Sequence, residues 1–260
     1  MAETQNNNDF SDLSLSANEP RTEITAMLFC AGLGTRFKPW TDKHPKALAI
    51  INGKTLLQRN IEYLQQYGIT DVVINVHHFA DQIIDTIEKN EGWGSTITIS
   101  DETEELLDTG GGLLKAKHLL FRRTILTLNV DILTEINLKD FLIHHQEQNA
   151  LITVAVSNRD TSRYLLFNKY DRFIGWRNKK TAETKIVIEA KEVFEKAYSG
   201  LAFFQPEALD LINLKGKFSL IDAFLQLAPQ NKIAAYDHTG ERWIDVGKPE
   251  SVKIAEEMFA

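Results

Sequence analysis

The sequence predicts an α/β fold in which helices cover a largely parallel sheet. Short apolar runs alternate along the first half of the chain with segments whose apolar residues recur at helical spacing. Residues 24–30 are apolar almost throughout and run directly into glycines, as expected for a strand buried on both faces. Ligands of such layered domains bind beyond the carboxyl ends of the strands, so we expect the functional residues in the loops that follow them.

The first half predicts four strands and three helices. Apolar runs place strands at 24–30, 71–76, 96–100 and 124–129. Helical periodicity places helices at 55–67, where Gly68 ends the pattern, at 79–89 and at 109–120, which begins in a run of glycines.

The second half is less regular. Strands are expected at 150–157, at 199–204 and 232–236, and as a pair within 163–176 joined by a turn at 168–171. Helices are expected at 206–214, at 219–227 and from residue 249 onward, after a short segment at 243–247. Residues 179–193 predict a loop-rich insertion, and the alternating charges of 189–196 suggest a surface helix.

Length and composition limit the class of protein. A chain of 260 residues can bury a substantial core without metal or disulfide staples, as one large domain or two closely packed halves. Its 29 Lys and Arg residues against 36 Asp and Glu give a net charge of −7, which argues against nucleic-acid binding but allows a small phosphate ligand. Cys30 is the only cysteine, which excludes an internal disulfide and a cysteine-based zinc site.

Residues 1–23 are polar and contain no apolar core of a secretory signal, so we expect a disordered tail. No stretch of 18 apolar residues occurs, and therefore no membrane span is expected. Together with the lone cysteine, these features predict a cytoplasmic protein.

The most informative motif is A-G-L-G-T-R-F-K-P-W-T-D-K-H-P-K, at residues 31–46. Gly32 and Gly34 follow a buried strand and let backbone N–H groups approach an anion. The third glycine of a dinucleotide-binding fingerprint would fall at Phe37, and no P-loop pattern occurs. Arg36 offers a bidentate fork for phosphate oxygens and Lys46 a compact charge. The alternative is a plain tight turn with two solvated cations.

A second glycine run follows at Thr109-Gly110-Gly111-Gly112. Glycines at a helix start leave unpaired N–H groups, a positive dipole end and no side chain to block a flat ligand. The alternative is a flexible helix entry, and the acidic run before it, 101–108, is expected to be mostly solvated.

Two aspartates complete the candidates. Asp131 follows the strand at 124–129, and Asp245 lies within the segment at 243–247. Either one alone could be an ordinary turn residue or helix cap.

The first motif resembles the sugar-1-phosphate nucleotidyltransferase family, whose hallmark is a strand followed by G-x-G-T-R-x-x-P-x-T and then P-K. The matching positions are Gly32, Gly34, Thr35, Arg36, Pro39, Thr41, Pro45 and Lys46. Segments 75–83, 107–116, 198–206 and 243–247 are most similar to the short N-acetylmuramate 1-phosphate uridylyltransferase type. Val130 departs from the family, which has glycine before the first aspartate, and its side chain would narrow the space for the sugar phosphate.

The resemblance implies a Rossmann-like α/β/α sandwich with a central, mainly parallel mixed sheet. Residues 24–157 would form a nucleotide-binding half and 158–260 a sugar-phosphate-binding half, packed as one continuous domain. It further implies catalytic roles for Arg36 and Lys46 and a magnesium ion held by Asp131 and Asp245. Nucleotide-binding positions would be Ala31, Gly32, Gly34, Thr35, Thr109, Gly110, Gly111 and Gly112. Gly200 and Asp222 would face the sugar.

The implied reaction transfers a nucleotidyl group from a nucleoside triphosphate, UTP by this resemblance, to a sugar 1-phosphate such as N-acetylmuramate 1-phosphate. A mannose- or heptose-1-phosphate guanylyltransferase and a phosphocholine cytidylyltransferase are alternatives within the family. An inactive homologue that senses nucleotide sugars is an alternative of another class, although such proteins usually lose the arginine, the lysine or an aspartate, and all four are present here. The residues do not indicate the oligomeric state.

Overall fold

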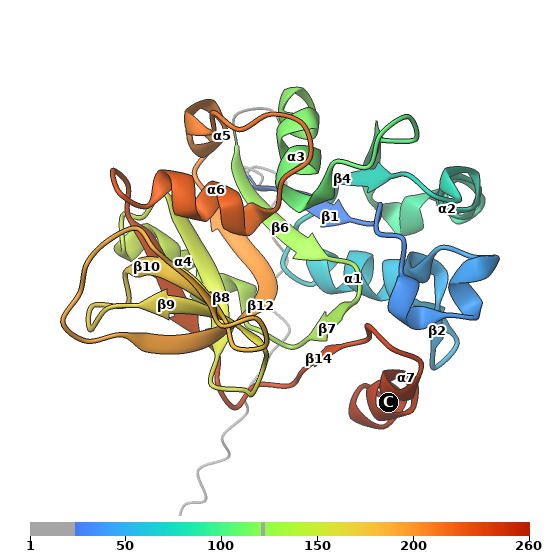
Figure 1. Cartoon of the computed structure of the whole chain (residues 1–260). Coiled ribbons are helices and arrows are strands. Elements are labelled where there is room, and N and C mark those ends of the chain that lie inside the picture. The colour runs from blue at the N-terminus through green and yellow to red at the C-terminus, as the bar shows by residue number, and fades with distance from the viewer. Residues whose placement is uncertain (1–23, 121–122) are drawn as a thin grey trace, which may run out of the picture.

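A ten-stranded mixed sheet runs through the computed structural model, which describes residues 24–120 and 123–260 (Figure 1). Its strands are β1 (Ile24–Phe29), β4 (Asp71–Val76), β5 (Thr96–Asp101), β6 (Thr124–Asn129), β8 (Ile152–Ser157), β9 (Arg163–Phe167), β10 (Phe173–Asn178), β11 (Glu183–Ile186), β12 (Phe194–Phe204) and β13 (Ile233–Asp237). The main path runs β11-β10-β9-β12-β6-β1-β4-β5, and β8 lies between β12 and β13. The predicted tail at 1–23 lies outside the described residues.

The sheet changes character between its two halves. β1 pairs in parallel with β4 and β6, and β4 with β5, so these carboxyl ends meet at one edge. β12 joins β6, β8 and β9 in antiparallel fashion, whereas β13 pairs with β8 in parallel. Two small ribbons accompany the sheet, β2 (Ile50–Ile51) with β3 (Lys54–Thr55) and β7 (Ile132–Thr134) with β14 (Trp243–Asp245).

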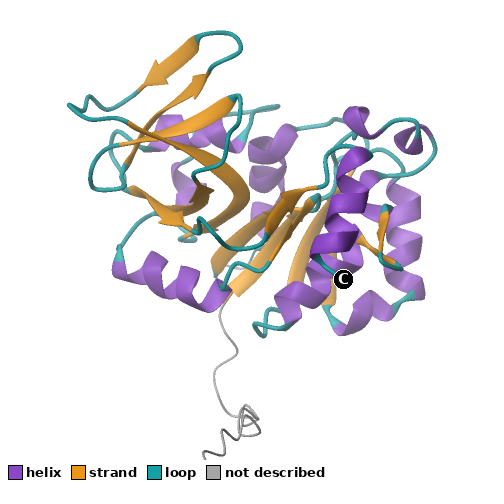
Figure 2. Cartoon of the chain, turned by 90° about the horizontal axis from the view of Figure 1, so that it is seen from below, coloured by secondary structure: helices purple, strands orange, loops and turns teal. Residues whose placement is uncertain are grey.

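Helices cover both faces of the sheet, as the view from below shows (Figure 2). The alternation of β1 explains this arrangement, since Ala26 and Leu28 enter one buried cluster while Met27 and Phe29 enter another. The first cluster includes residues of α1 (Leu56–Gln65), α2 (Ala80–Lys89), α4 (Leu138–Glu147) and α7 (Glu250–Met258). The second includes α3 (Asp108–Lys115), α5 (Ala208–Leu211) and α6 (Leu220–Leu227). The predicted Rossmann-like α/β/α fold is therefore confirmed.

Several details differ from the sequence-based expectations, and three of them lie within residues 138–196. The prediction of a surface helix at 189–196 was wrong, because β12 already begins at Phe194 and pairs with β9. The loop-rich insertion at 179–193 contains the exposed strand β11. The helix α4 was not predicted at all, although Asn137 caps it by accepting hydrogen bonds from Lys139 N and Asp140 N.

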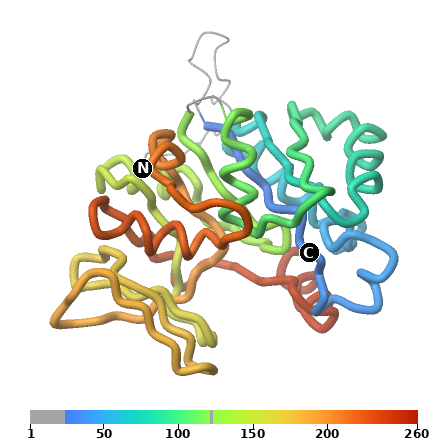
Figure 3. Tube along the Cα trace, turned by 45° about the horizontal axis from the view of Figure 1, so that its top comes forward, coloured from blue at the N-terminus to red at the C-terminus, as the bar shows by residue number. Residues whose placement is uncertain are grey.

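The C-terminal segment returns to the first half of the molecule. After β13, the chain passes through β14 and ends in α7, beside the segment that contains β2 (Figure 3). This return brings β14 against β7, next to the carboxyl end of β6. None of the described helices has the length and apolar character needed to cross a bilayer.

Candidate active site

The first glycine turn follows the carboxyl end of β1, and hydrogen bonds within the loop hold it closed. Gly34 has a left-handed backbone (φ 59°), and a Cβ there would lie 2.8 Å from Thr41 Cγ2. Its carbonyl accepts hydrogen bonds from Phe37 N at 2.7 Å and from Thr41 Oγ1 at 2.9 Å. By contrast, among the described residues other than its two chain neighbours, no atom lies within 4 Å of a Cβ built on Gly32, so this part of the loop is open to a ligand.

Lys46 and Asp131 form an ion pair beyond this loop. Lys46 follows Pro45 at the start of a short 3-10 helix, and Asp131 lies between β6 and β7. Only 13% of the lysine side chain and 17% of the aspartate side chain are exposed. The pair is therefore partly shielded from water, and its attraction is stronger than that of a surface pair.

Asp245 joins this pair from the far end of the sequence. β14 runs antiparallel to β7 with Asp245 opposite Ile132, and Val246 N donates to the Asp131 carbonyl at 2.8 Å. Arg36 Nη2 lies 3.9 Å from Asp245 Oδ2. The structure thus brings together all four residues for which the sequence predicts catalytic or metal-binding roles.

The two carboxylates repel each other. Burial, and then the negative charge of Asp131, raise the pKa of Asp245, while Lys46, Arg36 and Arg159 act in the opposite direction. In addition, Asp245 Oδ1 is buried and has no hydrogen-bond partner within residues 24–120 and 123–260. An unsatisfied oxygen beside a second carboxylate is what a divalent cation would relieve, and Mg²⁺ commonly takes one or two carboxylates together with substrate phosphates. Among the described residues, no larger group of His, Cys, Asp or Glu side chains gathers to bind a metal.

The second glycine run differs from the expectation. Gly110 N and Gly111 N both donate to the Phe218 carbonyl, at 2.9 and 3.0 Å, so the prediction that these N–H groups are unpaired was wrong. A Cβ on Gly111 would lie 2.4 Å from Gly216 O. The glycines let α3 pack against the loop before α6, and Thr109 Oγ1 accepts from Leu220 N at 3.0 Å in the same contact.

A buried polar network links the two glycine segments. Asn75 Oδ1, at the end of β4, accepts from Cys30 N at 2.7 Å, and Asn75 Nδ2 donates to Glu102 Oε1 at 2.7 Å. Glu102 is fully buried, and a Cβ on Gly112 would lie 2.5 Å from its Oε1. Sequence reasoning missed Glu102 because it lies in an acidic run that was expected to be solvated.

A cavity of about 190 Å³ lies between the two glycine segments. Its lining residues come from the carboxyl ends of β1 and β4, from the loops after β1 and β5 and from the start of α3: Phe29, Ala31, Gly32, Asn75, Glu102, Leu106, Asp108 and Thr109, joined by Lys217. This cavity lies where the predicted nucleotide-binding positions meet.

The predicted sugar-side residues behave differently from one another. Gly200 has φ 85°, and a Cβ there would lie 2.8 Å from Ile132 Cγ1, so Gly200 packs beside the strand that follows Asp131. The Asp222 carboxylate accepts from Ser219 N and Oγ in a capping box at the start of α6. No hydrogen bond or ion pair connects Asp222 to either candidate metal ligand in the described part of the chain.

Val130 does not narrow the site. Its side chain is 4% exposed and belongs to the core cluster on the α1 face, so it points into the protein interior. Its carbonyl accepts a hydrogen bond from Asn60 Nδ2 of α1 at 2.9 Å, which fixes the backbone just before Asp131.

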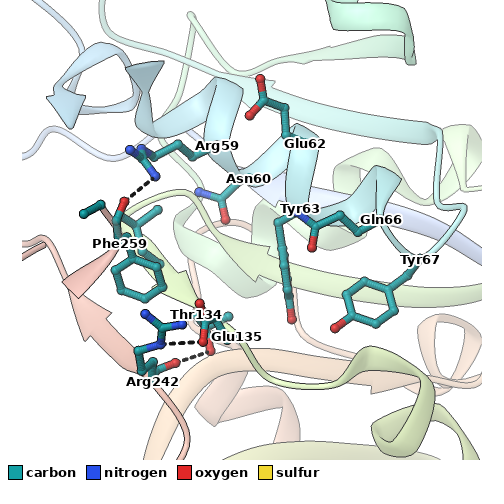
Figure 4. A pocket seen from close by; sticks show the side chains of 12 residues that line it. Arg59, Asn60, Glu62, Tyr63, Gln66, Tyr67, Thr134, Glu135, Arg242 and Phe259 are labelled. Carbon is teal, nitrogen blue, oxygen red and sulfur yellow. Dashed lines mark hydrogen bonds and ion pairs between the residues drawn. The ribbon is translucent and has the colours of Figure 1, made fainter. Parts of the chain in front are cut away.

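A second cavity, of about 460 Å³, lies between α1 and the β7–β14 ribbon (Figure 4). Arg59 and Tyr63 line it from α1, and Arg242 and Phe259 line it from the C-terminal segment. Arg242 Nε donates to Glu135 at 2.5 Å, and Arg59 Nη1 donates to the Phe259 carbonyl at 3.3 Å. None of the predicted site residues lines this cavity, and its polar contacts hold the C-terminal segment in place.

Two curated relatives cover most of this chain. It is 29% identical over 247 residues to the N-acetylmuramate alpha-1-phosphate uridylyltransferase of Caulobacter vibrioides, covering 90% of this chain and 96% of that protein. It is 28% identical over 230 residues to Mannose-1-phosphate guanyltransferase 2 of Candida glabrata, covering 87% of this chain. The chain spans only 62% of the length of that guanyltransferase.

Solved structures share the fold. HddC from Yersinia pseudotuberculosis matches with a TM-score of 0.74 at 24% identity, covering 91% of this chain and 99% of that one. The UDP-glucose pyrophosphorylase from Acinetobacter baumanii matches with a TM-score of 0.73 at 15% identity, covering 89% and 91%. At these identities the likeness concerns the fold alone.

A family model described as Nucleotidyl transferase matches residues 25–259. This match spans nearly all of the described residues and confirms the family that the sequence motifs predict. The chain belongs to the nucleotidyl transferase family.

Proposed function

We propose that the protein transfers a nucleotidyl group from a nucleoside triphosphate to a sugar 1-phosphate, releasing pyrophosphate. The observation that carries this proposal is the convergence of Arg36, Lys46, Asp131 and Asp245 beyond the carboxyl ends of β1 and β6. Three separate stretches of the chain supply these residues. Two polyanions must meet in this reaction, and the site offers cations together with a carboxylate pair suited to a divalent ion.

The chemistry needs no protein nucleophile. A phosphate oxygen of the sugar 1-phosphate forms a bond to the α-phosphorus, and the bond from that phosphorus to the pyrophosphate oxygen breaks. The second pKa of a phosphate lies near 6, so the attacking group is already an anion at neutral pH and needs no general base. Catalysis then consists of positioning and charge stabilisation.

The site residues divide these tasks. Arg36 and the backbone at Ala31, Gly32, Gly34 and Thr35 bind the β- and γ-phosphates of the leaving group. Lys46 stabilises charge at the α-phosphate. The base lies in the cavity beside Thr109 and the glycines that follow it, where Gly110, Gly111 and Gly112 allow the close packing that shapes its wall.

Asp131 and Asp245 would hold Mg²⁺, which supplies Lewis-acid stabilisation of the reacting phosphates when bound. The unpartnered Asp245 Oδ1 and the repulsion between the two carboxylates support this assignment. Without a cation, Lys46 and Arg36 partly neutralise the pair.

UTP and N-acetylmuramate 1-phosphate are the substrates we propose. The segments at 107–116 and 243–247 resemble the uridylyl type, and the uridylyltransferase relative is 29% identical to this chain over 247 residues. GTP with mannose 1-phosphate is the second candidate, because the guanyltransferase is equally similar in sequence. The proposed setting is the cytoplasm, where nucleoside triphosphates are made, and the buried Cys30 fits a reducing compartment.

A matrix of substrates tests the proposal. UTP, GTP, CTP and dTTP are each combined with N-acetylmuramate, N-acetylglucosamine and mannose 1-phosphates in the presence of Mg²⁺, and pyrophosphate release is followed. We expect the highest kcat/KM for UTP with N-acetylmuramate 1-phosphate. Pyrophosphate release with GTP and mannose 1-phosphate alone would select the second candidate, and nucleotide-sugar binding without any release would indicate an inactive homologue.

A further inference from the structure

A third cation, Arg159, lies near the carboxylate pair, and the sequence motifs do not include it. Arg159 belongs to the loop after β8, whereas Arg36 and Lys46 follow β1. Its charge acts on Asp245, and that of Asp245 acts on it in return. Its guanidinium lies over the ring of Trp243, two residues before Asp245, so Arg159 approaches this aspartate from the second half of the chain.

The fold holds this guanidinium in place. Its Cζ lies 4.1 Å from the centroid of the Trp243 ring, two residues before Asp245, and its Nη2 donates to the Tyr198 carbonyl at 2.6 Å. Trp243 is fixed in turn, because its Nε1 donates to the Ser199 carbonyl at 2.8 Å. A planar group stacked and bonded in this way has lost most of its freedom before any ligand binds.

An irregularity in β12 makes these contacts possible. The register with β8 shifts between Tyr198 and Ala202, and Gly200 adopts φ 85° within that shift. The carbonyls of Tyr198 and Ser199 thereby face Arg159 and Trp243 rather than both entering the sheet ladder. Gly200, which was predicted to face the sugar, acts here through the backbone it shapes.

The charge of Arg159 lacks a close partner. Across the described residues, no carboxylate lies within ion-pair distance of its guanidinium, and its Nε is buried without a hydrogen bond. Partial burial of an unpaired cation is unfavourable and lowers the pKa of Arg159. An anion bound beside the guanidinium would offset this cost.

We propose that Arg159 binds an anionic oxygen of the sugar-phosphate acceptor, on the side of Asp245 that faces the second half of the chain. This assignment rests on the proposed function. Two acceptor groups have the required chemistry, the 1-phosphate itself and a carboxylate carried by the sugar. N-acetylmuramate 1-phosphate has both, whereas N-acetylglucosamine 1-phosphate has a free hydroxyl in place of the lactyl ether that carries the carboxylate.

The test compares Arg159→Gln with the wild-type protein in two measurements. The first is calorimetric binding of N-acetylmuramate 1-phosphate and of N-acetylglucosamine 1-phosphate, and the second is the KM of each acceptor and of the triphosphate during pyrophosphate release. We expect acceptor affinity to fall about 10- to 100-fold, as for loss of a hydrogen bond to a charged group, with the KM of the triphosphate unchanged. Arg159→Lys should recover part of the loss.

A comparison of the two acceptors shows which of the two anionic groups Arg159 binds. An equal loss for both means that Arg159 binds the 1-phosphate, and a loss confined to N-acetylmuramate 1-phosphate means that it binds the carboxylate. Because binding is measured without turnover, the absence of pyrophosphate release from the wild-type protein would count against the proposed function and leave the binding test intact.

Arg172→Gln is the matched control. Arg172 also donates Nη2 to a carbonyl, that of Ala228 at 3.1 Å, and its buried Nε also has no partner among the described residues. It lies beside the amino end of β13, however, whereas Arg159 follows the carboxyl end of the parallel neighbour β8. We expect this variant to lose stability without losing acceptor affinity. Unchanged acceptor binding in a folded Arg159→Gln protein, equal losses in the two variants, or no acceptor binding by the wild-type protein would overturn the proposal.

Discussion

The ionised carboxylate of Asp245 is electrostatically unfavourable in the folded protein. The side chain is confined beside Asp131, and its raised pKa shows that ionisation is less favourable in the folded protein than in the unfolded chain. A carboxyl group shifted in this direction lowers stability as the pH rises from its unfolded pKa, near 3.9, through its folded pKa. At neutral pH, therefore, the Asp245 charge favours the unfolded state.

Asp245→Asn should stabilise the metal-free protein and impair its activity. We expect a higher Tm at pH 7 in the presence of a chelator, and a fall in kcat of at least about 100-fold, because a ligand that stabilises the reacting phosphates is lost. Differential scanning fluorimetry and a pyrophosphate assay measure the two effects. Asp85→Asn, on the exposed side of α2, is the control and should change neither. A lower Tm for Asp245→Asn would contradict the electrostatic account.

At this scale the sequence reveals residues but not their environments. Arg36, Lys46 and Asp131 were predictable because a recognisable motif or a strand end marks them. Glu102 and Arg159 were not, since the partners that define them, Asn75 and Trp243, lie 27 residues or more away in the chain. Side-chain burial and stacking depend on such distant contacts.

The glycine segments act at the scale of elements, and they serve different purposes. Gly111 allows α3 to approach the Gly216 carbonyl, whereas Gly32 has open space around it. Gly111 is thus required by packing, whereas Gly32 is available to a ligand. Both lie in similar-looking glycine runs, so the sequence predicted one purpose for both.

Alanine substitutions at Gly111 and Gly32 distinguish a packing role from a ligand-binding role. Gly111→Ala should destabilise the protein by about 1–3 kcal/mol, because backbone must move away from the new methyl group. Gly32→Ala should leave stability within about 0.5 kcal/mol, as for a surface substitution, while raising the KM of the triphosphate. Urea unfolding and steady-state kinetics check these outcomes. Equal stability of the two variants would contradict the packing role assigned to Gly111.

Elements with strong patterns were predicted well, and those with weak patterns were not. β1, β4 and β6 are short, mostly apolar runs, and this local composition identifies a buried strand before its partners are known. The charge alternation at 189–196 resembled a surface helix, but Phe194, Glu195 and Lys196 pair with β9 instead. Tertiary pairing overrode a local pattern that was itself weak.

At the scale of the whole molecule, two buried histidines make stability depend on pH. His145 accepts or donates at Nδ1 with Thr153 Oγ1 at 2.7 Å, and His238 does so at Nε2 with Ser199 Oγ at 2.6 Å. Burial lowers the pKa of each to about 4, below the usual 6.5. The unfolded chain therefore binds protons more readily than the folded protein, and stability is lost as the pH falls from 6.5 towards 4.

The free energy of unfolding should decrease over this range by roughly 3 kcal/mol for each histidine. Chemical denaturation at a series of pH values measures it. His145→Gln removes one titrating group, so its stability should fall less steeply with decreasing pH, whatever its stability at pH 7. The same slope in both proteins would show that His145 does not titrate as described.

The path of the whole chain also explains why composition and periodicity did not predict that Asp131 and Asp245 meet. The chain returns from β13 to pair β14 with β7, and this return places Asp245 beside Asp131. The short strand β14 carries no local signal for its partner. The family resemblance implied that the two aspartates meet, whereas composition and periodicity alone left each of them open to an ordinary structural role.

The account depends most directly on the carboxylate pair being the centre of nucleotidyl transfer. The decisive measurement is pyrophosphate release by Asp131→Asn, which keeps the shape of the side chain, with UTP, N-acetylmuramate 1-phosphate and Mg²⁺ at saturating concentrations. The account predicts a folded protein whose kcat is at least about 100-fold below that of the wild type. Turnover near the wild-type rate would contradict it.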